Sequence, residues 1–379
     1  MRLRRIILPF TVIAIGGLVA TGCSSADAGA DAESAPDSSF RIVTSTSVYA
    51  DIVSAIVGDG AEVEAVIDSA AVDPHDYEAT ARDGLTVNDA DLVIMNGGGY
   101  DQFMTDLLET AGVEHVMSVV EFSHAYPGGG GEHDDHDHAD EGDHDDDEHA
   151  DEGEHAGESD DDHADEGDHD HADGGDHDHA DEGDHEHADE GDHDHADEGD
   201  DHDHIHGFNE HVWYDPHTIE HFAEALQEEL DELIPEAADQ VAAGTQGVLD
   251  EISALEGRLD AIASDHEGET AFFTEPVGGY FAKAAGLEDA TTDGFAEAVE
   301  HGEDVAPAVL NKAIKSIESG EVSVLVANAQ TGGAETSRVI EVAESNDVPV
   351  IEFTETIPDG ESYFGWMNAN ADALEGALG

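Results

Sequence analysis

Residues 40–67 read FRIVTSTSVYADIVSAIVGDGAEVEAVI, and this stretch decides the fold class. Residues 40–46 are rich in β-branched side chains, residues 48–57 carry apolar side chains at helical spacing, and residues 62–67 read as a second strand. Strands that alternate with helices of about ten residues indicate βαβ units, in which consecutive strands run parallel. The stretch therefore predicts an α/β protein with a parallel-type sheet flanked by helices.

The same alternation continues toward the middle of the chain. It predicts a helix over 79–88, a strand over 91–95, a helix over 100–109 and a strand over 116–122. Another helix is expected to begin at Asp215 and Pro216, with the aspartate as N-cap and the proline in the first helical position.

One very long helical pattern separates this half from a second α/β half. Apolar side chains recur at steps of three, four and seven through residues 236–266, which predicts a rigid connecting helix of about 25 residues. The elements expected beyond it are a strand at 270–274, helices at 280–285 and 307–319, a strand at 322–327, a helix at 334–345, a strand at 348–353 and a helix after Ser362. We therefore expect two lobes, each with a parallel-type sheet flanked by helices, joined by the long helix.

Between residues 127 and 206 the periodic pattern stops. This segment holds 18 histidines and 38 acids, and four nearly identical eight-residue units begin at Asp168, Asp176, Asp184 and Asp192. The units offer no large apolar side chain to bury, so we expect a disordered His/Asp-rich insertion. Its His-x-His pairs suit the capture of zinc, copper or nickel, and a solubilising acidic spacer is the alternative. The accessory metal candidates are His169, His171, His177, His179, His185, His187, His193, His195, His202, His204 and His206.

The start of the chain has the pattern of an export signal. Three arginines within the first five residues precede an apolar run over 6–20 and then Cys23, which predicts a signal peptide that is removed. Cys23 is the only cysteine, which excludes an intrachain disulfide, and its setting resembles a bacterial lipobox with Ala20 where leucine is usual. We expect lipidation at Cys23 and a position on the outer face of the cytoplasmic membrane, held there by the lipid anchor only; a plain secretory signal is the alternative. The expected segments are a signal peptide (1–22), a lipid-anchored tether (23–39), an N-terminal lobe (40–126 and 207–235), the insertion (127–206), the connecting helix (236–266) and a C-terminal lobe (267–379).

The chain is strongly acidic, with 95 acidic residues against 10 lysines and arginines. Outside the insertion and the signal, 57 acids still face 7 basic residues. Self-repulsion of this size is screened by salt, which predicts a halophilic or salt-tolerant source. The absence of a basic surface excludes nucleic acid as a partner, because nothing would displace phosphate counterions.

Three segments outside the insertion carry the candidate metal ligands. Residues 73–78 read DPHDYE, residues 210–216 read EHVWYDP and residues 273–280 read FTEPVGGY. His75 and His211 lie where a strand or its loop gives way to the next element, which is where open α/β sheets place ligands. Metal-binding histidines need their second nitrogen held by a polar neighbour, and both segments offer such neighbours. From the residues alone, hydrogen-bonded loop histidines are the alternative.

Taken in order, these motifs resemble those of the metal-specific solute-binding lipoproteins of ABC importers, the zinc/manganese family of cluster A-I. Residues 74–78 match its Pro-His-x-Tyr-Glu pattern, and residues 211–216 match its His-x-Trp-x-Asp-Pro pattern. Zinc-specific members often insert a His/Asp-rich loop between the two, as here. The resemblance covers the exported chain outside the repeats. It implies two α/β lobes joined by one long helix, His75 and His211 as ligands, an ABC permease and its ATPase as partners, and a monomer.

The third ligand departs from the zinc pattern of the family. Zinc members commonly carry His-Asp-Ala-Phe/Tyr-x-Tyr at the start of the C-terminal lobe, and Glu275 occupies the place of that histidine. Manganese-binding relatives carry glutamate there. Oxygen ligands suit harder ions and imidazole suits zinc, so two histidines and a carboxylate do not choose between Zn²⁺ and Mn²⁺. An exposed acid is the alternative for Glu275. The fourth ligand stays open among Asn328, Gln330, Glu335, Glu355 and a water.

The expected function is that of a lipid-anchored receptor that binds one Zn²⁺ between its lobes through His75, His211 and Glu275 and delivers it to a permease. A manganese receptor of the same family and a metal-buffering surface lipoprotein without a transport role are the alternatives. A metallohydrolase is disfavoured, because neither His-Glu-x-x-His nor Gly-x-Ser-x-Gly occurs in the chain. We therefore expect no enzymatic activity.

Overall fold

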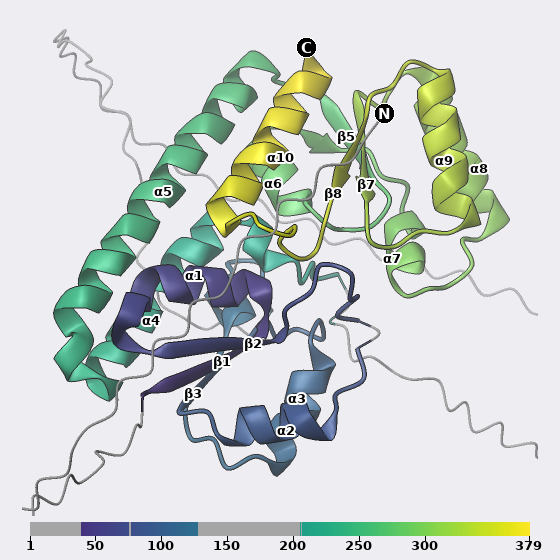
Figure 1. The fold of residues 1–379 in the computed structure, drawn as a ribbon. Coiled ribbons are helices and arrows are strands. Elements are labelled where there is room, and N and C mark those ends of the chain that lie inside the picture. Colours follow the sequence, from purple (N-terminus) through teal and green to yellow (C-terminus); the bar gives the residue numbers. More distant parts are fainter. Residues whose placement is uncertain (1–38, 76, 128–204, 206) are drawn as a thin grey trace, which may run out of the picture.

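The computed structural model describes residues 39–75, 77–127, 205 and 207–379. Within them the chain forms two lobes, each built on a four-stranded sheet with helices packed around it (Figure 1). The expected signal peptide, Cys23 and every accessory histidine of the insertion lie outside the described residues. In the part of the chain that is described, no helix is both long and apolar enough to cross a membrane.

The N-terminal sheet is fully parallel and has the strand order β2-β1-β3-β4. Its strands are β1 (Arg41–Thr46), β2 (Glu62–Ile67), β3 (Leu92–Met95) and β4 (Val116–Ser118), and its helices are α1 (Ser47–Val57), α2 (Ala81–Asn88) and α3 (Gln102–Thr110). The central strands β1 and β3 are almost continuously buried, as expected for a parallel sheet covered on both faces. The predicted α/β class is confirmed.

The strand expected over 116–122 is shorter than predicted. It ends at Ser118, and Val119–Phe122 forms a 3-10 helix, η2. Its neighbour β3 already ends at Met95, so the ladder has no partner for residues beyond Ser118. The amide of Val120 instead donates to the carbonyl of Asn96 over 3.0 Å. The strand β4 therefore ends because β3 offers no further residue to pair with, and not because the hydrophobic pattern changes.

Two long helices follow the insertion and join the lobes. They are α4 (Pro216–Leu233) and α5 (Ala238–Asp265), separated by a 3-10 turn at Pro235–Ala237, η4. The 28-residue α5 packs against α1 and α4 at one end and against α6 and α10 at the other (Figure 1). Its buried side chains follow the spacing read from the sequence: Val241, Val248, Ile252, Leu255, Leu259 and Ile262. The long connecting helix is therefore confirmed.

The backbones of α1 and α5 touch where glycine is required. A Cβ atom added to Gly244 would lie 2.1 Å from the carbonyl oxygen of Ile56 and 2.8 Å from that of Ala55. Because both obstacles are backbone atoms, no side-chain rotation could make room for it. The contact fixes α5 closely against the N-terminal lobe.

The C-terminal sheet is also parallel, with the order β6-β5-β7-β8. Its strands are β5 (Thr270–Phe273), β6 (Glu288–Asp289), β7 (Val324–Asn328) and β8 (Val350–Phe353). The surrounding helices are α6 (Gly279–Ala284), α7 (Phe295–Glu300), α8 (Pro307–Ser319), α9 (Ala334–Ser345) and α10 (Tyr363–Leu378). The two-residue β6, which is too short for a periodic pattern, and the six-residue α7 were not predicted.

The 3-10 helix η3 (Val212–Tyr214) forms the seam between the lobes. Tyr214 stacks on Phe353 with ring centroids 5.6 Å apart, and its hydroxyl donates to the carbonyl of Thr354 over 2.7 Å. The hydroxyl of Tyr363 donates in turn to the carbonyl of Trp213 over 2.7 Å. One hydrophobic cluster runs from α1 through η3 to α10, so both lobes share a core at this seam.

Candidate metal centre

Side chains that follow strands of both sheets meet at the seam between the lobes. His75 lies in the loop after β2, His211 directly precedes η3, and Glu355 follows β8. Each offers one ligand atom, and these atoms all lie within 4.8 Å of one another. Nε2 of His75 is 3.6 Å from Oε2 of Glu355. The carboxyl ends of parallel strands are the usual ligand site of open α/β sheets, and here two sheets contribute to one site.

The loop around His75 is held by its own polar side chains. Oδ1 of Asp73 accepts a hydrogen bond from the amide of His75 over 2.9 Å, and the hydroxyl of Tyr77 donates to Asp83 over 2.9 Å. Asp83 is the third residue of α2 and forms the capping box at its start together with Thr80. The imidazole packs edge-on against Tyr100 with centroids 4.9 Å apart. The Tyr77 side chain thus fastens the histidine loop to a helix start.

His75 is also the most accessible member of the group. Its side chain is 10% exposed, against 1% for Glu355 and 1% for His211. It lies in the wall of an open pocket of about 710 Å³ that Tyr77, Tyr100 and Phe103 also line. The group is therefore open to solvent at the His75 side.

His211 is oriented by an amide from its own segment. Oδ1 of Asn209 lies 2.9 Å from Nδ1 of His211 and accepts the backbone amide of His211 over 3.0 Å. The Nδ2 of Asn209 donates to the carbonyl of Pro276 over 3.0 Å, and the hydroxyl of Tyr280 donates to the carbonyl of Asn209 over 2.8 Å. An acceptor facing Nδ1 places the proton on that nitrogen and leaves Nε2 as the ligand atom. Asn209 therefore fixes the tautomer of this histidine, and Pro276 and Tyr280 of the C-terminal lobe hold Asn209 in place.

Glu355 is a fully buried carboxylate. Its Oε1 accepts from Nδ2 of Asn328 over 2.7 Å, and its backbone amide donates to Oε1 of Gln330. Among the described residues no hydrogen bond reaches its Oε2, the atom that faces His75. Burial, helped by the negative charges of Asp73 and Glu275, raises the pKa of Glu355 to about 8. A bound cation would satisfy the bare oxygen and offset the cost of its burial.

Glu275 is buried beside this group but is not one of the three residues within 4.8 Å. Its carboxylate accepts from the hydroxyl of Thr331 and from Nδ2 of Asn328, the latter over 2.8 Å. The same amide nitrogen of Asn328 therefore holds both Glu275 and Glu355. Burial raises the pKa of Glu275 despite these two hydrogen bonds. The alternative of an exposed acid is wrong, since only 3% of the residue is accessible.

The structure gives different contacts to the candidates for a fourth ligand. Glu355 joins the two histidines, whereas Asn328 donates to the carboxylates of Glu275 and Glu355, and Gln330 accepts from the backbone amide of Glu355. Gln330 also donates from Nε2 to the carbonyl of Ala70 over 3.0 Å, which links the C-terminal lobe to the loop that carries His75. Glu335 lies in the first turn of α9 and belongs to none of the metal-compatible groups of the described chain.

Two further acids lie near His211 and were not predicted as site residues. Glu210, His211 and Glu300 form a second group whose ligand atoms lie within 4.8 Å of one another, and Oε1 of Glu300 is 3.8 Å from Nδ1 of His211. Burial and the charge of Glu210 raise the pKa of Glu300 well above its usual range. Glu210 adjoins the histidine motif and could have been noticed. Glu300 is the last residue of α7, a helix that the hydrophobic pattern did not predict.

The motif residues after His211 have structural roles. Trp213 packs edge-on against the His211 ring with centroids 5.1 Å apart. Asp215 does occupy the N-cap position of α4, but its side chain accepts from the hydroxyl of Thr218 over 2.6 Å and makes no hydrogen bond to the helix backbone. The helix begins at the predicted residue, but Asp215 bonds a side chain there and not the helix backbone.

Two parallel-sheet lobes that bring imidazole and carboxylate side chains together at their junction define an α/β binding protein with a candidate metal site. The chain belongs to the family described as zinc-uptake complex component A, periplasmic, whose model matches residues 42–377.

Comparison with individual proteins gives three different metals. The chain is 28% identical to the manganese-binding lipoprotein MntA of Halalkalibacterium halodurans over 125 residues, which are 33% of this chain and 40% of the relative. It is 30% identical to the iron-binding protein YfeA of Yersinia pestis over 111 residues, 29% of this chain and 33% of the relative. Both matches cover well under two thirds of the relative. The periplasmic zinc binding protein TroA from Treponema pallidum shares the fold, with a TM-score of 0.60 and 17% identity over 90% of this chain and 99% of that chain.

Proposed function

We propose that the chain is the extracytoplasmic solute-binding component of an ABC importer and that its cargo is a divalent metal ion. The observation that carries this proposal is the convergence of His75 and His211 from one lobe with Glu355 from the other. Ligands drawn from both lobes allow the ion to stabilise the junction when it binds. A metal buffer needs no such convergence.

The proposed ligands are His75, His211, Glu355 and Glu275. The first three already lie within 4.8 Å of one another. Glu275 is held next to them through the amide of Asn328, which donates to both carboxylates. In the proposed loaded state the cation compensates the negative charge of both carboxylates, and Glu275 completes a four-ligand shell.

We propose Zn²⁺ as the cargo, since two imidazoles and two carboxylates form a four-ligand set that zinc accepts. Manganese is the second candidate, and the specific observation in its favour is the presence of two buried carboxylates, Glu275 and Glu355. Carboxylate oxygens suit Mn²⁺ better than imidazole does. The family model names zinc, whereas the two relatives compared above carry manganese and iron in their names.

A lipid on Cys23 would anchor a monomer to the outer face of the cytoplasmic membrane, from where it would deliver the ion to a permease driven by an ATPase. The insertion over 127–206 would collect ions near the site. No chemical step on a substrate is part of this function.

A competitive titration with Zn²⁺ and Mn²⁺ tests the proposal, on protein that lacks residues 1–23 and 128–206. We expect one tight site that is lost in His75→Ala. His115→Ala is the matched control, because His115 pairs with Glu229 at 2.7 Å outside the group. Tighter binding of Mn²⁺ than of Zn²⁺ would make the second candidate the cargo. A protein with no tight site at all would exclude the receptor function.

A further inference from the structure

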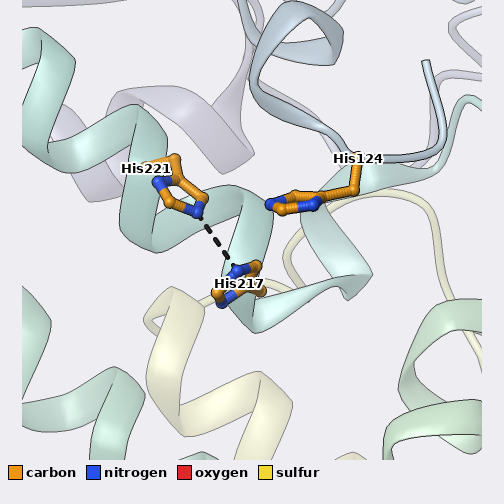
Figure 2. A group of neighbouring side chains, drawn as sticks. All are labelled: His124, His217 and His221. Atoms are coloured by element: carbon orange, nitrogen blue, oxygen red, sulfur yellow. Dashed lines mark hydrogen bonds between the residues drawn. The ribbon is translucent and has the colours of Figure 1, made fainter. Parts of the chain in front are cut away.

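A second cluster of histidines lies on the surface of the N-terminal lobe, apart from the centre described above. His217 and His221 occupy the first two turns of α4, and His124 lies in the segment that follows η2 (Figure 2). The three rings offer nitrogen atoms that all lie within 4.8 Å of one another. His124 and His217 are exposed and His221 is half-buried. None of the three belongs to the His75–His211–Glu355 group.

The spacing of the two helical histidines suits a metal ion. Residues four apart lie on one face of a helix, and Nε2 of His217 is 3.1 Å from Nε2 of His221. A tetrahedral ion with metal–nitrogen bonds near 2.0–2.1 Å holds its nitrogens about 3.3–3.4 Å apart. Only a small rotation of either ring separates the observed distance from that value.

The third ring closes the cluster from a different element. The centroid of His124 lies 5.0 Å from that of His217 and 5.5 Å from that of His221. Figure 2 shows it reaching toward the helical pair from the neighbouring loop. A hydrogen bond between two neutral imidazoles accounts for the helical pair alone. It does not account for a third ring within coordination range of both.

Acids behind the cluster support a cation there. Nδ1 of His217 lies 3.6 Å from Oε2 of Glu220, on the side of the ring opposite Nε2. Glu256 of α5 joins these two in an overlapping group whose ligand atoms lie within 4.8 Å of one another. A carboxylate beside the second nitrogen is the usual support of a metal-binding histidine. The ligand nitrogens thus face the other histidines while the acids lie behind.

We propose that His124, His217 and His221 form a second, solvent-accessible site for a borderline transition-metal ion of the Zn²⁺, Cu²⁺ or Ni²⁺ class, with water as the remaining ligand. Three imidazoles select this class over Mg²⁺, Ca²⁺ and Mn²⁺, which favour oxygen. Binding joins the segment after η2 to the start of α4. The site takes a metal whether or not the His75–His211–Glu355 group is a transport site.

Carbethoxylation of histidines, mapped peptide by peptide by mass spectrometry, tests this site in the full chain. Free Zn²⁺ is fixed by a chelator buffer, so that the 18 histidines of the insertion do not deplete it. We expect His124, His217 and His221 to become protected together along one zinc curve. In His221→Asn, the curves of His124 and His217 should shift to at least about tenfold higher zinc, since one of three ligands is gone.

Two variants and a second metal make the result specific. His301→Asn changes an exposed histidine outside the cluster and should leave the three curves in place. His75→Ala should also leave them in place, which separates this site from the His75–His211–Glu355 group. Mn²⁺ at the same free concentration should give no protection. Independent curves for the three histidines, no shift in His221→Asn, or equal protection by Mn²⁺ would each overturn the proposal.

Discussion

The side-chain amide of Asn328 donates a hydrogen bond to Oε1 of Glu355 over 2.7 Å. The same nitrogen donates to Oε2 of Glu275 over 2.8 Å, so a single neutral group holds two buried carboxylates in place. Both carboxylates have raised pKa values because burial disfavours their charged forms. The Asn328 amide is therefore a neutral clamp on both carboxylates. It holds them in place and leaves the compensation of their negative charge to a bound cation.

Removal of this clamp should weaken metal binding. In Asn328→Ala we expect the affinity for Zn²⁺ to fall by about 10–100-fold, because supporting hydrogen bonds orient metal ligands. Competition against a chelating dye measures the change. Asn346→Ala is the control, since Asn346 donates to the carbonyl of Val342 at the end of α9 and should retain full affinity. Equal affinities in the two variants would contradict the role given to Asn328.

The tautomer of His211 should depend on Asn209. Asn209→Ala removes the acceptor at Nδ1, and we expect a loss of zinc affinity of about 10–100-fold. Asn209→Asp keeps an acceptor oxygen at Nδ1 of His211 but loses the donor to the carbonyl of Pro276, so it should restore part of the affinity. The same competition assay measures both variants. An aspartate variant as weak as the alanine variant would show that tautomer control is not the reason.

The pKa of Glu355 gives a pH dependence with a definite sign. Its folded-state pKa, about 8, lies above the ordinary value of 4.5, so the folded metal-free protein holds a proton that the unfolded chain releases. Its contribution to stability is complete below about pH 4.5 and is lost as the pH rises to about 8. Urea unfolding in chelator between pH 5 and pH 8.5 should show a shallower decline for Glu355→Gln than for the unchanged protein. Glu352→Gln, which alters an exposed acid of β8, should keep the full decline.

Two glycines of α5 should respond oppositely to alanine. Gly244→Ala should destabilise the protein by about 1–3 kcal/mol, because the added Cβ would lie 2.1 Å from the carbonyl oxygen of Ile56. At Gly247 no atom lies within 4 Å of the added Cβ, so Gly247→Ala should stabilise the helix by about 1 kcal/mol. Urea unfolding measures both. Changes of the same sign would contradict the close contact of α5 with α1.

The insertion should matter only when metal is scarce. Deletion of residues 128–206 should leave the zinc affinity of the His75–His211–Glu355 group unchanged and should reduce zinc uptake by cells at limiting zinc. Uptake assays at low and at ample zinc compare the two chains. Unchanged uptake under scarcity would remove the collecting role proposed for the insertion.

The fold was predictable where long periodic patterns carry it. The apolar steps through α5 and the β-rich runs of β1 and β7 gave the class and the order of elements, because burial of one face enforces such patterns. The elements that were not predicted are β6 and α7. Both are short, and β6 pairs through Glu288 and Asp289, acids that carry no apolar signal.

The site was predictable only in part, for a related reason. His75 and His211 lie in local motifs that can be read along the chain. The third member of the group, Glu355, comes from the opposite lobe, and the choice among five candidates for the fourth ligand depended on how the lobes pack. The hydrogen bonds of Asn328 to both carboxylates and the position of Glu300 near His211 also depend on how the lobes pack. Glu275 as a ligand stays a prediction.

The unequal burial of the three converging ligands has a kinetic consequence. His211 and Glu355 are sealed beneath the seam, whereas the ring of His75 alone borders the open pocket. In the proposed loaded state, arrival of the ion would form, and its departure would break, the bond to His75 at the outer boundary of the site. The residence time of the ion would then depend on the loop between β2 and α2, where Tyr77 is bonded to Asp83. A permease that loosens this one loop would accelerate unloading without opening the two lobes.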